Sequence, residues 1–466
     1  MPSPRHIAFR PLWTSVLLLA LLGLGACNAF RIPAPPARPT PDRPIWNSDE
    51  VQGHLTLFNA PEQAGRATGT LGYANAAAYV GARLREFGFQ PRQGSDFRVL
   101  YPTPVHLPRA VELLSLGADT VRYAPGRHML LDGRTDSVRV RLSRWARGSA
   151  TSGSPDVVVV LTPEEATDAT LLQLAEDGIR ATWIAVPNLS PSVSSTHFDK
   201  VGVVQVQQAA LARLLGLSEV ELAQALARPT GGGVLPRPVV LSTRIQRQAN
   251  GTGINLVGYL SGKHPGLRGE AVLVCTDLDG LGSIEQAQIT DRTHSGLATA
   301  ALLEMARQVG AVSDYSTFPE RTLIVGVWSS ARSQHQGLDA FLRKPGWPTA
   351  AIQQVLYLGA QPADTLVLRQ RFQQAGLPVL FLDVPPAVLD QPLVTARTRA
   401  PFAQPRATPL PAAWFDPEAV AEAEATALLP TLSSFYQRLF WALTDHKAIY
   451  PPPADQLSPP IPYRAE

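Results

Sequence analysis

The chain has 466 residues, of which 45% are hydrophobic and 17% charged, and its formal net charge is only +3. A chain of this length and composition has enough apolar residues for two domains with cores of their own. The small net charge gives no sign of a nucleic-acid-binding protein, and we expect no nucleic-acid partner. The two cysteines are Cys27 and Cys275, so stability has to come from hydrophobic cores.

The first 27 residues have the pattern of an export signal. A positively charged start precedes the apolar stretch 13–24, which is too short for a comfortable membrane span. The stretch ends in Leu24-Gly25-Ala26-Cys27, which resembles a bacterial lipobox. We therefore expect cleavage before Cys27, a lipid on this cysteine and a membrane-anchored lipoprotein of the cell envelope. Ordinary secretion with cleavage near the same point is the alternative.

The composition along the chain then suggests the domain boundaries. Residues 28–47 are rich in proline and should form an extended tether, and the Pro-rich residues 451–466 should form an extended or disordered tail. Between them, we expect a folded domain that begins in residues 48–101, is interrupted by residues 102–245 and is completed by residues 246–450.

The first part of this domain contains a glycine-punctuated loop, residues 64–72, followed by apolar residues at helical spacing in residues 74–87. The loop has the form Gly-Arg-x-x-Gly-Thr-x-Gly. It resembles the loop before the N-terminal helix of the co-catalytic zinc aminopeptidases, which are relatives of glutamate carboxypeptidase and the transferrin receptor.

The interrupting residues have a pattern of their own. Val157–Leu161 is a continuous apolar run and therefore predicts a buried strand. A helix is predicted over residues 166–178, and further strands over Ala181–Val186 and residues 201–206. This order resembles a protease-associated domain, which is often inserted at this place in the same family. An unrelated small α/β insertion is the alternative.

Residues 246–450 alternate strands with helices. Strands are predicted over residues 254–260, 271–276 and 321–328, and helices over residues 296–309, 338–343 and 417–443. This alternation predicts an α/β fold in which helices sandwich a mixed or parallel sheet, and the resemblance implies the zinc-aminopeptidase-like version of it. In such sheets the chemistry lies beyond the carboxyl ends of the strands.

The stretch 289–307 carries the resemblance furthest. Ser295 is a plausible N-cap of a buried helix that continues through Leu302. In the resembled family this helix follows a loop of the form Gly-Ala-Asp-Asp-Asn-Ala-Ser-Gly, whose aspartate bridges two zinc ions. Here the resemblance places Arg292 at the bridging position, with Asp291 one residue away. An alignment anchored on Glu304 places His294 there instead.

The other functional positions of the family are replaced as well. A two-zinc peptidase needs histidine and carboxylate ligands and a glutamate that deprotonates the bridging water. The resemblance places these residues at the ligand positions: Cys275, Arg292, Arg332, Gly359 (with Gln361 as second choice) and Thr395. Ala331 falls at the general base and Arg369 at a histidine that lines the pocket. Asp277 alone keeps its family identity, as the aspartate that orients the first histidine ligand.

These replacements predict a peptidase-family-like protein that has lost zinc and peptidase activity, needs no cofactor, and has a binding or assembly role. In the resembled family, the transferrin receptor keeps the fold without peptidase chemistry. The alternative is an active zinc-dependent aminopeptidase with a rearranged site, in which Asp291 or Cys275 binds zinc.

The candidate pocket residues are Cys275, Asp277, Asp291, Arg292, Arg332 and Arg369. Arginine binds carboxylate and phosphate groups through its planar fork, so an anionic small molecule or peptide is a candidate ligand. Alternatively, the arginines pair with Asp277, Asp279 and Asp291 and fill the vacated site.

Two further hypotheses concern single side chains near the predicted site. Cys275, Asp277, His294 and His335 would make a new metal or nucleophilic site if they lay together. The alternatives are a small buried residue for Cys275 and surface loops for the two histidines. Glu304, inside the central helix, is predicted to be a structural hydrogen-bonding residue.

Overall fold

The computed structural model describes residues 40–444 with these gaps: 93, 124, 126–127, 149–153, 188, 190–197, 199, 281, 285–286, 291–294, 332–333, 361–363, 385–392 and 397–416. The described residues all belong to the compact unit that starts at Thr40. The predicted signal, Cys27, most of the predicted tether and the Pro-rich tail lie outside the described residues.

Two capped helices begin the fold. The side chain of Asn47 accepts hydrogen bonds from the backbone N–H groups of Asp49 and Glu50, at 3.0 and 3.3 Å, and so caps α2 (Ser48–Asn59). The short helix η1 (Pro61–Arg66) follows. The Thr70 side chain then caps α3 (Leu71–Glu86), which starts three residues before the predicted helix.

Among the described residues, seven strands form the central sheet, in the order β1-β11-β15-β12-β16-β17, with β2 also paired to β11. Their bounds are β1 (Gln90–Pro91), β2 (Arg98–Pro102), β11 (Thr252–Leu260), β12 (Ala271–Asp277), β15 (Thr322–Trp328), β16 (Ile352–Leu358) and β17 (Val379–Leu382). The last four of these form parallel pairs, whereas β11 runs antiparallel to β15, so the sheet is mixed.

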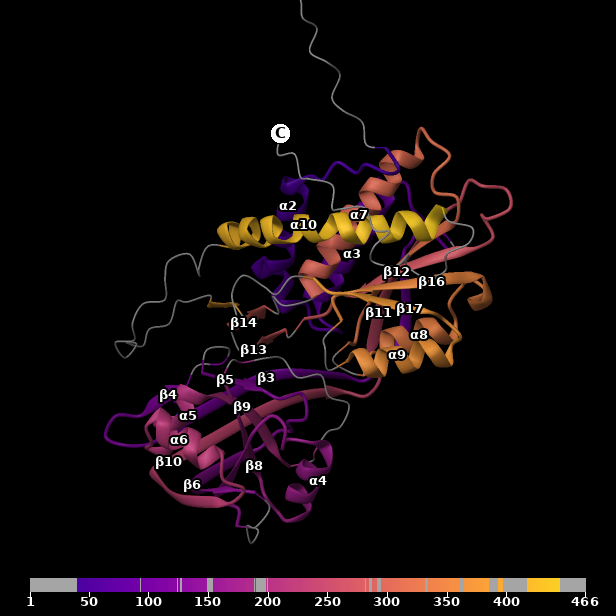
Figure 1. Cartoon of the computed structure of the whole chain (residues 1–466). Coiled ribbons are helices and arrows are strands. Elements are labelled where there is room, and N and C mark those ends of the chain that lie inside the picture. The colour runs from indigo at the N-terminus through magenta and orange to yellow at the C-terminus, as the bar shows by residue number, and fades with distance from the viewer. Residues whose placement is uncertain are drawn as a thin grey trace, which may run out of the picture. The chain divides into compact units, whose positions relative to one another are not determined.

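Helices cover both faces of this sheet (Figure 1). Four of them, α2, α3, α7 (Ser295–Ser313) and α10 (Pro417–Thr444), pack with Val272 and Val274 in one core. The other face carries α8 (Gln336–Arg343) and α9 (Thr365–Gln374), which pack with Leu273 and Cys275. Successive residues of β12 thus point to opposite cores, as the pleat of a strand requires. The predicted α/β sandwich is confirmed.

A second sheet contains the interrupting residues and has the strand order β4-β3-β10-β6-β7-β8-β9-β5. Its strands are β3 (Val105–Ser115), β4 (Val121–Tyr123), β5 (Met129–Leu131), β6 (Arg139–Arg147), β7 (Val157–Leu161), β8 (Ala181–Val186), β9 (Gly202–Gln207) and β10 (Gly231–Gln248). The helices α4 (Asp168–Glu176), α5 (Gln208–Leu215) and α6 (Glu219–Leu226) complete it, and its core is separate from those of the central sheet. Pairing of Gln248 with Val105 carries the sheet three residues beyond the predicted boundary at 245.

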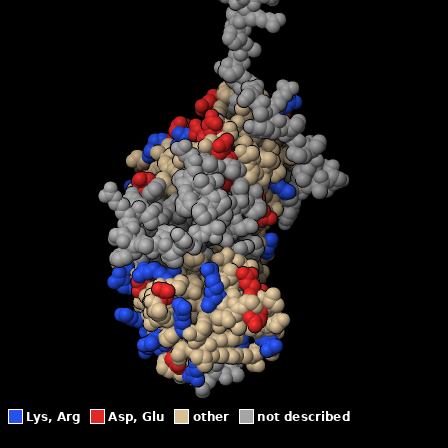
Figure 2. Space-filling model, turned by 90° about the vertical axis from the view of Figure 1, so that its left-hand side faces the viewer, with Lys and Arg blue, Asp and Glu red and all other residues tan. Residues whose placement is uncertain are grey.

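The surface of this part carries charges of both signs. On the face shown in Figure 2, Lys and Arg side chains gather over the lower part, with Asp and Glu side chains among them. Arg139 and Arg141 of β6 are exposed because Val140 and Leu142, which alternate with them, point into the core.

Three small strands and a short helix come from the same part of the chain as the last strands of the central sheet. The strands β13 (Ser283–Ile284), β14 (Ala287–Thr290) and β18 (Leu393–Ala396) form an antiparallel sheet, and η2 (Thr349–Ala351) precedes β16. The sheet places Thr395 opposite Gln288.

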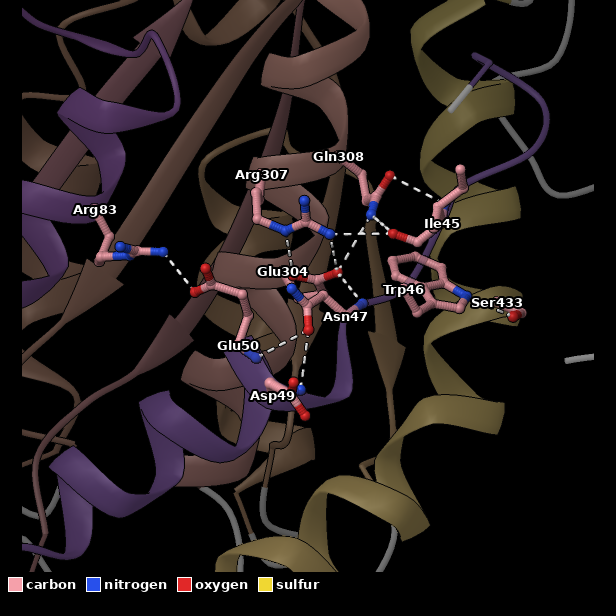
Figure 3. A network of polar contacts seen from close by, with 10 residues as sticks. All are labelled: Ile45, Trp46, Asn47, Asp49, Glu50, Arg83, Glu304, Arg307, Gln308 and Ser433. Carbon is pink, nitrogen blue, oxygen red and sulfur yellow. Dashed lines mark hydrogen bonds and ion pairs between the residues drawn. The ribbon is translucent and has the colours of Figure 1, made fainter. Parts of the chain in front are cut away.

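The last residues of the predicted tether belong to the fold (Figure 3). Glu304, which is fully buried in α7, accepts the backbone N–H of Asn47 at 3.1 Å and two guanidinium nitrogens of Arg307 at 2.7 Å. Ile45 donates to the side chain of Gln308 at 3.2 Å. Glu304 is therefore the structural hydrogen-bonding residue that the sequence predicts, and the tether ends before Ile45.

His54, on the buried face of α2, makes folding depend on pH. Its Nδ1 lies 2.6 Å from the hydroxyl of Tyr79. Burial, followed by the positive charges of Arg83 and Arg307, lowers the pKa of His54 to about 3. The unfolded chain binds a proton at this histidine below its ordinary pKa of about 6.5, whereas the folded chain binds none until far lower pH. Stability is therefore lost as the pH falls below about 6.5.

We expect the His54→Gln variant to lose less stability on acidification than the wild type. Between pH 7 and pH 5, the difference should be about 2 kcal/mol at 1.36 kcal/mol per pKa unit. Urea unfolding of both proteins at the two pH values measures it. Equal losses in the two proteins would show that His54 takes up its proton in the folded state as easily as in the unfolded chain.

Candidate functional site

The carboxyl ends of three parallel strands meet at one edge of the central sheet. The register pairs Asp277 of β12 with Trp328 of β15, and Cys275 with Tyr357 of β16. The segments after these strands, which include Ala331 and Gly359, therefore start at the same edge. Four of the positions predicted from the sequence, Cys275, Asp277, Ala331 and Gly359, come together in this way.

The Gly-Arg-x-x-Gly-Thr loop holds the segment that follows β12. The carbonyl oxygens of Gly65 and Arg66 accept the backbone N–H groups of Gly282 and Gly280, at 2.9 and 3.0 Å. Gly65 has a positive φ of 68°, and a Cβ there would collide with the carbonyl of Gly282. The fully buried guanidinium of Arg66 donates to the carbonyl of Leu278 at 3.1 Å and also to that of Phe58. The loop therefore positions the edge of the site.

Asp279 joins three segments at this edge. One carboxylate oxygen accepts the backbone N–H of Ala331 at 3.1 Å, and the other accepts the hydroxyl of Thr68 at 3.3 Å. The Thr68 hydroxyl in turn accepts the backbone N–H of Ser330 at 2.8 Å. Because Asp279 is buried, these bonds fix the backbone at the predicted general-base position, where the side chain is a methyl group.

A buried acid–histidine cluster lies beside Asp279. Asp277 accepts the hydroxyl of Tyr357 at 2.6 Å. His335 lies between two carboxylates, with Nδ1 3.8 Å from Asp277 and Nε2 3.8 Å from Asp364. His335 is only 3% exposed, so its interpretation as a surface-loop residue is wrong. Its backbone N–H donates to the carbonyl of Ala331 at 3.2 Å, which ties it to the same edge.

The cluster carries strongly perturbed acidities. Burial raises the pKa of Asp277 to about 6, against the pull of His335 and with a further rise from Asp279. Burial acts to lower the pKa of His335, but the carboxylates of Asp364 and Asp277 outweigh it, and the pKa is raised. The two carboxylates therefore stabilise the protonated form of the imidazole.

Tyr101 and two serines form a neighbouring hydroxyl cluster. The hydroxyl of Tyr101 lies 2.7 Å from that of Ser329 and donates to that of Ser330 at 2.9 Å. Burial raises the pKa of Tyr101 to about 12, so it is a neutral hydrogen-bonding group. Sequence analysis did not single out Tyr101, Tyr357 or Asp364. Of these, Asp364 had a usable signal, because it follows the carboxyl end of β16.

Cys275 is fully buried in the core on the α8 face. Burial raises the pKa of its thiol well above the usual value, and Asp277 raises it further. The thiolate is the nucleophilic form, so a buried neutral thiol is unreactive. The interpretation of Cys275 as a small buried residue therefore fits the structure better than a reactive site does.

The described residues do not fit a zinc ion. They contain no group of three or more histidine, cysteine, aspartate or glutamate side chains arranged to hold a metal. One oxygen of Asp277 is bonded to Tyr357 and the other has no hydrogen-bond partner among the described residues, while both oxygens of Asp279 accept hydrogen bonds. Zinc needs three or four ligands that converge on one point, and the described side chains at this edge do not form such a group.

The remaining pocket candidates divide into two groups. Asp291, Arg292, His294, Arg332 and Gln361 lie outside the described residues, and for Thr395 only the strand is described. Arg369 is exposed, and its guanidinium lies 5.1 Å from the ring centre of Phe381. The arginine of α9 that acts on the buried cluster is Arg371, whose charge opposes the protonation of His335.

No protein-family model and no curated protein sequence matches the chain. Solved structures do match. The crystal structure of a peptidase M28 precursor from Shewanella amazonensis SB2B has a TM-score of 0.52 and 12% identity, over 87% of this chain and 97% of that one. The protein has a zinc-aminopeptidase-like fold. The expectation from the sequence is confirmed at this level.

Two other matches to the zinc-aminopeptidase-like fold are more distant. The zinc aminopeptidase BSAP from Bacillus subtilis has a TM-score of 0.46 and 12% identity, over 83% of this chain and 94% of that one. An aminopeptidase from Aneurinibacillus sp. strain AM-1 has a TM-score of 0.46 and 10% identity, over 72% of this chain and 84% of that one.

Proposed function

We propose that this protein is a pseudo-aminopeptidase, which keeps the zinc-aminopeptidase-like fold without zinc or peptidase activity and has a binding or assembly role at the cell envelope. The proposal rests on the side chain and the backbone bonding of Ala331. Its side chain has no group that can take a proton from water, and its backbone N–H is bonded to Asp279. A peptidase of this kind needs a carboxylate at that place.

The remaining acidic groups support the proposal. Asp277 and Asp279 are engaged by Tyr357, Ala331 and Thr68, so they stabilise the edge of the sheet internally. Asp277 also faces the imidazole of His335 at 3.8 Å. A divalent cation at this edge would have to displace these hydrogen-bond partners, which opposes binding.

We expect the purified protein to contain much less than one zinc ion per chain and to leave aminoacyl nitroanilides unhydrolysed. Elemental analysis after purification without chelators, and a hydrolysis assay with added zinc, measure the two properties. Two tightly bound zinc ions together with chelator-sensitive hydrolysis would establish the alternative, an active aminopeptidase with a rearranged site.

We also propose that a lipid on Cys27 anchors the protein to a membrane. The proposal rests on the lipobox-like sequence, because Cys27 lies outside the described residues. None of the described helices has the length and apolar character needed to cross a membrane.

The Cys27→Ser variant is expected to move from the detergent phase to the aqueous phase in a detergent partition experiment, because the acyl chains that hold the protein are lost. Labelling with a radioactive fatty acid should mark the wild type alone. A variant that stays in the membrane fraction after a high-salt wash would contradict the lipid anchor.

A further inference from the structure

A cavity of about 640 Å³ lies beside β2, at a different edge of the central sheet from the carboxyl ends of the strands where Asp277 and Ala331 lie. Its walls come from residues 96–102, which include β2, from Asn255, Val257 and Tyr259 of β11, and from the end of α8 with the residues after it. The volume falls within the range of pockets that bind small molecules or a few residues of a peptide. Asp277, His335 and Asp364 are not among its lining residues.

The floor of the cavity is apolar and built in advance. Phe97, Val257 and Phe341 are each less than 5% exposed. Tyr259 stacks on Trp347 with ring centres 6.0 Å apart. The polar atoms of Asn255 are already used, because its amide donates to the carbonyl of Gly337 at 2.7 Å and accepts the N–H of Ser329. The floor therefore suits apolar side chains of a ligand.

The rim of the cavity is cationic. Four of its lining side chains are positively charged and one is negatively charged, and that one, Asp96, is paired with Arg98 at 2.7 Å. Arg92, Arg343 and Lys344 are exposed, and none of the three forms an ion pair within the part of the chain that the structure describes. The uncompensated charge favours a ligand with carboxylates.

The strand β2, which lies at the outer side of the sheet, indicates what form that ligand takes. Within the described residues, β2 pairs only with β11, so its outer edge has backbone groups without a strand partner. Leu100 and Val99 of this strand are 65% and 44% exposed. Soluble proteins usually protect such an apolar edge, and peptides bind to edges of this kind as an added strand.

We propose that this edge binds an extended acidic segment of a partner protein, which adds to β2 as a further strand. Alternate side chains of an added strand point to the same face. Apolar side chains on that face of the segment would enter the cavity, while carboxylates on the same face reach Arg92, Arg343 and Lys344 at its rim. The proposal names the class of partner for the binding role proposed above, and it rests on that proposed role.

The test uses the full mature protein and the fluorescein-labelled octapeptide Val-Thr-Glu-Thr-Val-Thr-Glu-Thr, whose valine and glutamate side chains all point to one face of an extended strand. Saturable binding, measured by fluorescence anisotropy, is expected, and it should weaken at least ten-fold in the double variant Arg343→Glu, Lys344→Glu. The matched control is Arg139→Glu, Arg141→Glu, which reverses two exposed charges on β6 and should leave binding unchanged. Circular dichroism confirms that both variants are folded.

Two further peptides test the binding mode. A peptide with lysine in place of glutamate should not bind. Two peptides, one N-methylated at the odd residues and one at the even residues, should differ in affinity. Only one of the two sets of N–H groups faces β2, so only one peptide loses its hydrogen bonds to the strand. Equal binding of both methylated peptides, or equal binding of the lysine peptide, would overturn the proposal.

The remaining outcomes separate this inference from the proposed function. A lack of saturable binding of the glutamate peptide to a zinc-free, inactive protein would overturn the peptide site alone. Binding to an active zinc enzyme would overturn the pseudo-aminopeptidase proposal and leave the site standing. In the last outcome, the protein binds no peptide but co-sediments with phosphatidylglycerol vesicles, and the Arg343→Glu, Lys344→Glu variant does not. This result would assign the cationic rim to a membrane surface and overturn the peptide as its ligand.

Discussion

The Glu304→Ala variant is expected to lower the free energy of unfolding by about 3 kcal/mol, because it removes one partner of a buried ion pair. Glu304 is fully buried and accepts two nitrogens of Arg307 at 2.7 Å each. Its loss also leaves the backbone N–H of Asn47 without its acceptor, directly before α2. The variant should therefore loosen the N-terminal segment from α7 as well as destabilise the fold.

An exposed ion pair provides the control for Glu304. Glu86 forms an ion pair with Arg83 at 2.7 Å, but its side chain is 61% exposed. Glu86→Ala should cost less than about 1 kcal/mol, because water replaces the lost partner. Urea unfolding of both variants measures the difference, and protease sensitivity before residue 48 reports on the N-terminal segment. Equal small losses in both variants would mean that Glu304 is not engaged as the structure places it.

The elements that the sequence predicted correctly are those whose burial leaves a local pattern. β12 and β15 are buried on both faces, so they appear in the sequence as continuous apolar runs. α7 packs in the core through apolar residues at helical spacing, which predicted it apart from its ends. An N-cap residue stands directly before the first residue of a helix. Ser295 is itself the first residue of α7, so the predicted N-cap position is off by one residue.

The features that the sequence could not predict depend on contacts between distant residues. The N-terminal boundary is set by bonds from Asn47 and Ile45 to α7, across more than 250 residues of chain. His335 precedes α8 in a segment with no apolar pattern, and only the folded chain places it between Asp277 and Asp364. A single polar residue in a loop carries no local sign of its burial, because its partners come from distant parts of the chain.

The candidate site illustrates both cases. The resemblance located Cys275, Asp277 and Ala331 at one sheet edge because each follows or ends a predictable strand. It did not show that Asp277 is bonded to Tyr357 and faces His335 in a buried polar cluster. The predicted replacement of the ligands and the hydrogen bonds made by the remaining acids are thus separate arguments for the same proposal.

The Leu302→Ala variant is expected to lower the free energy of unfolding by roughly 2–5 kcal/mol, because it leaves a cavity in the core between α7 and the sheet. Leu302 is 1% exposed and packs in the same core as Val272, Val274 and the helices α2, α3 and α10. Removing its isopropyl group costs the burial of that surface and the contacts of its neighbours, which cannot close the gap fully. Leu366 on α9 is the matched control, since it is 65% exposed and Leu366→Ala should change stability by less than about 0.5 kcal/mol. Thermal and urea unfolding compare the two, and a negligible loss for Leu302→Ala would place the buried face of α7 elsewhere.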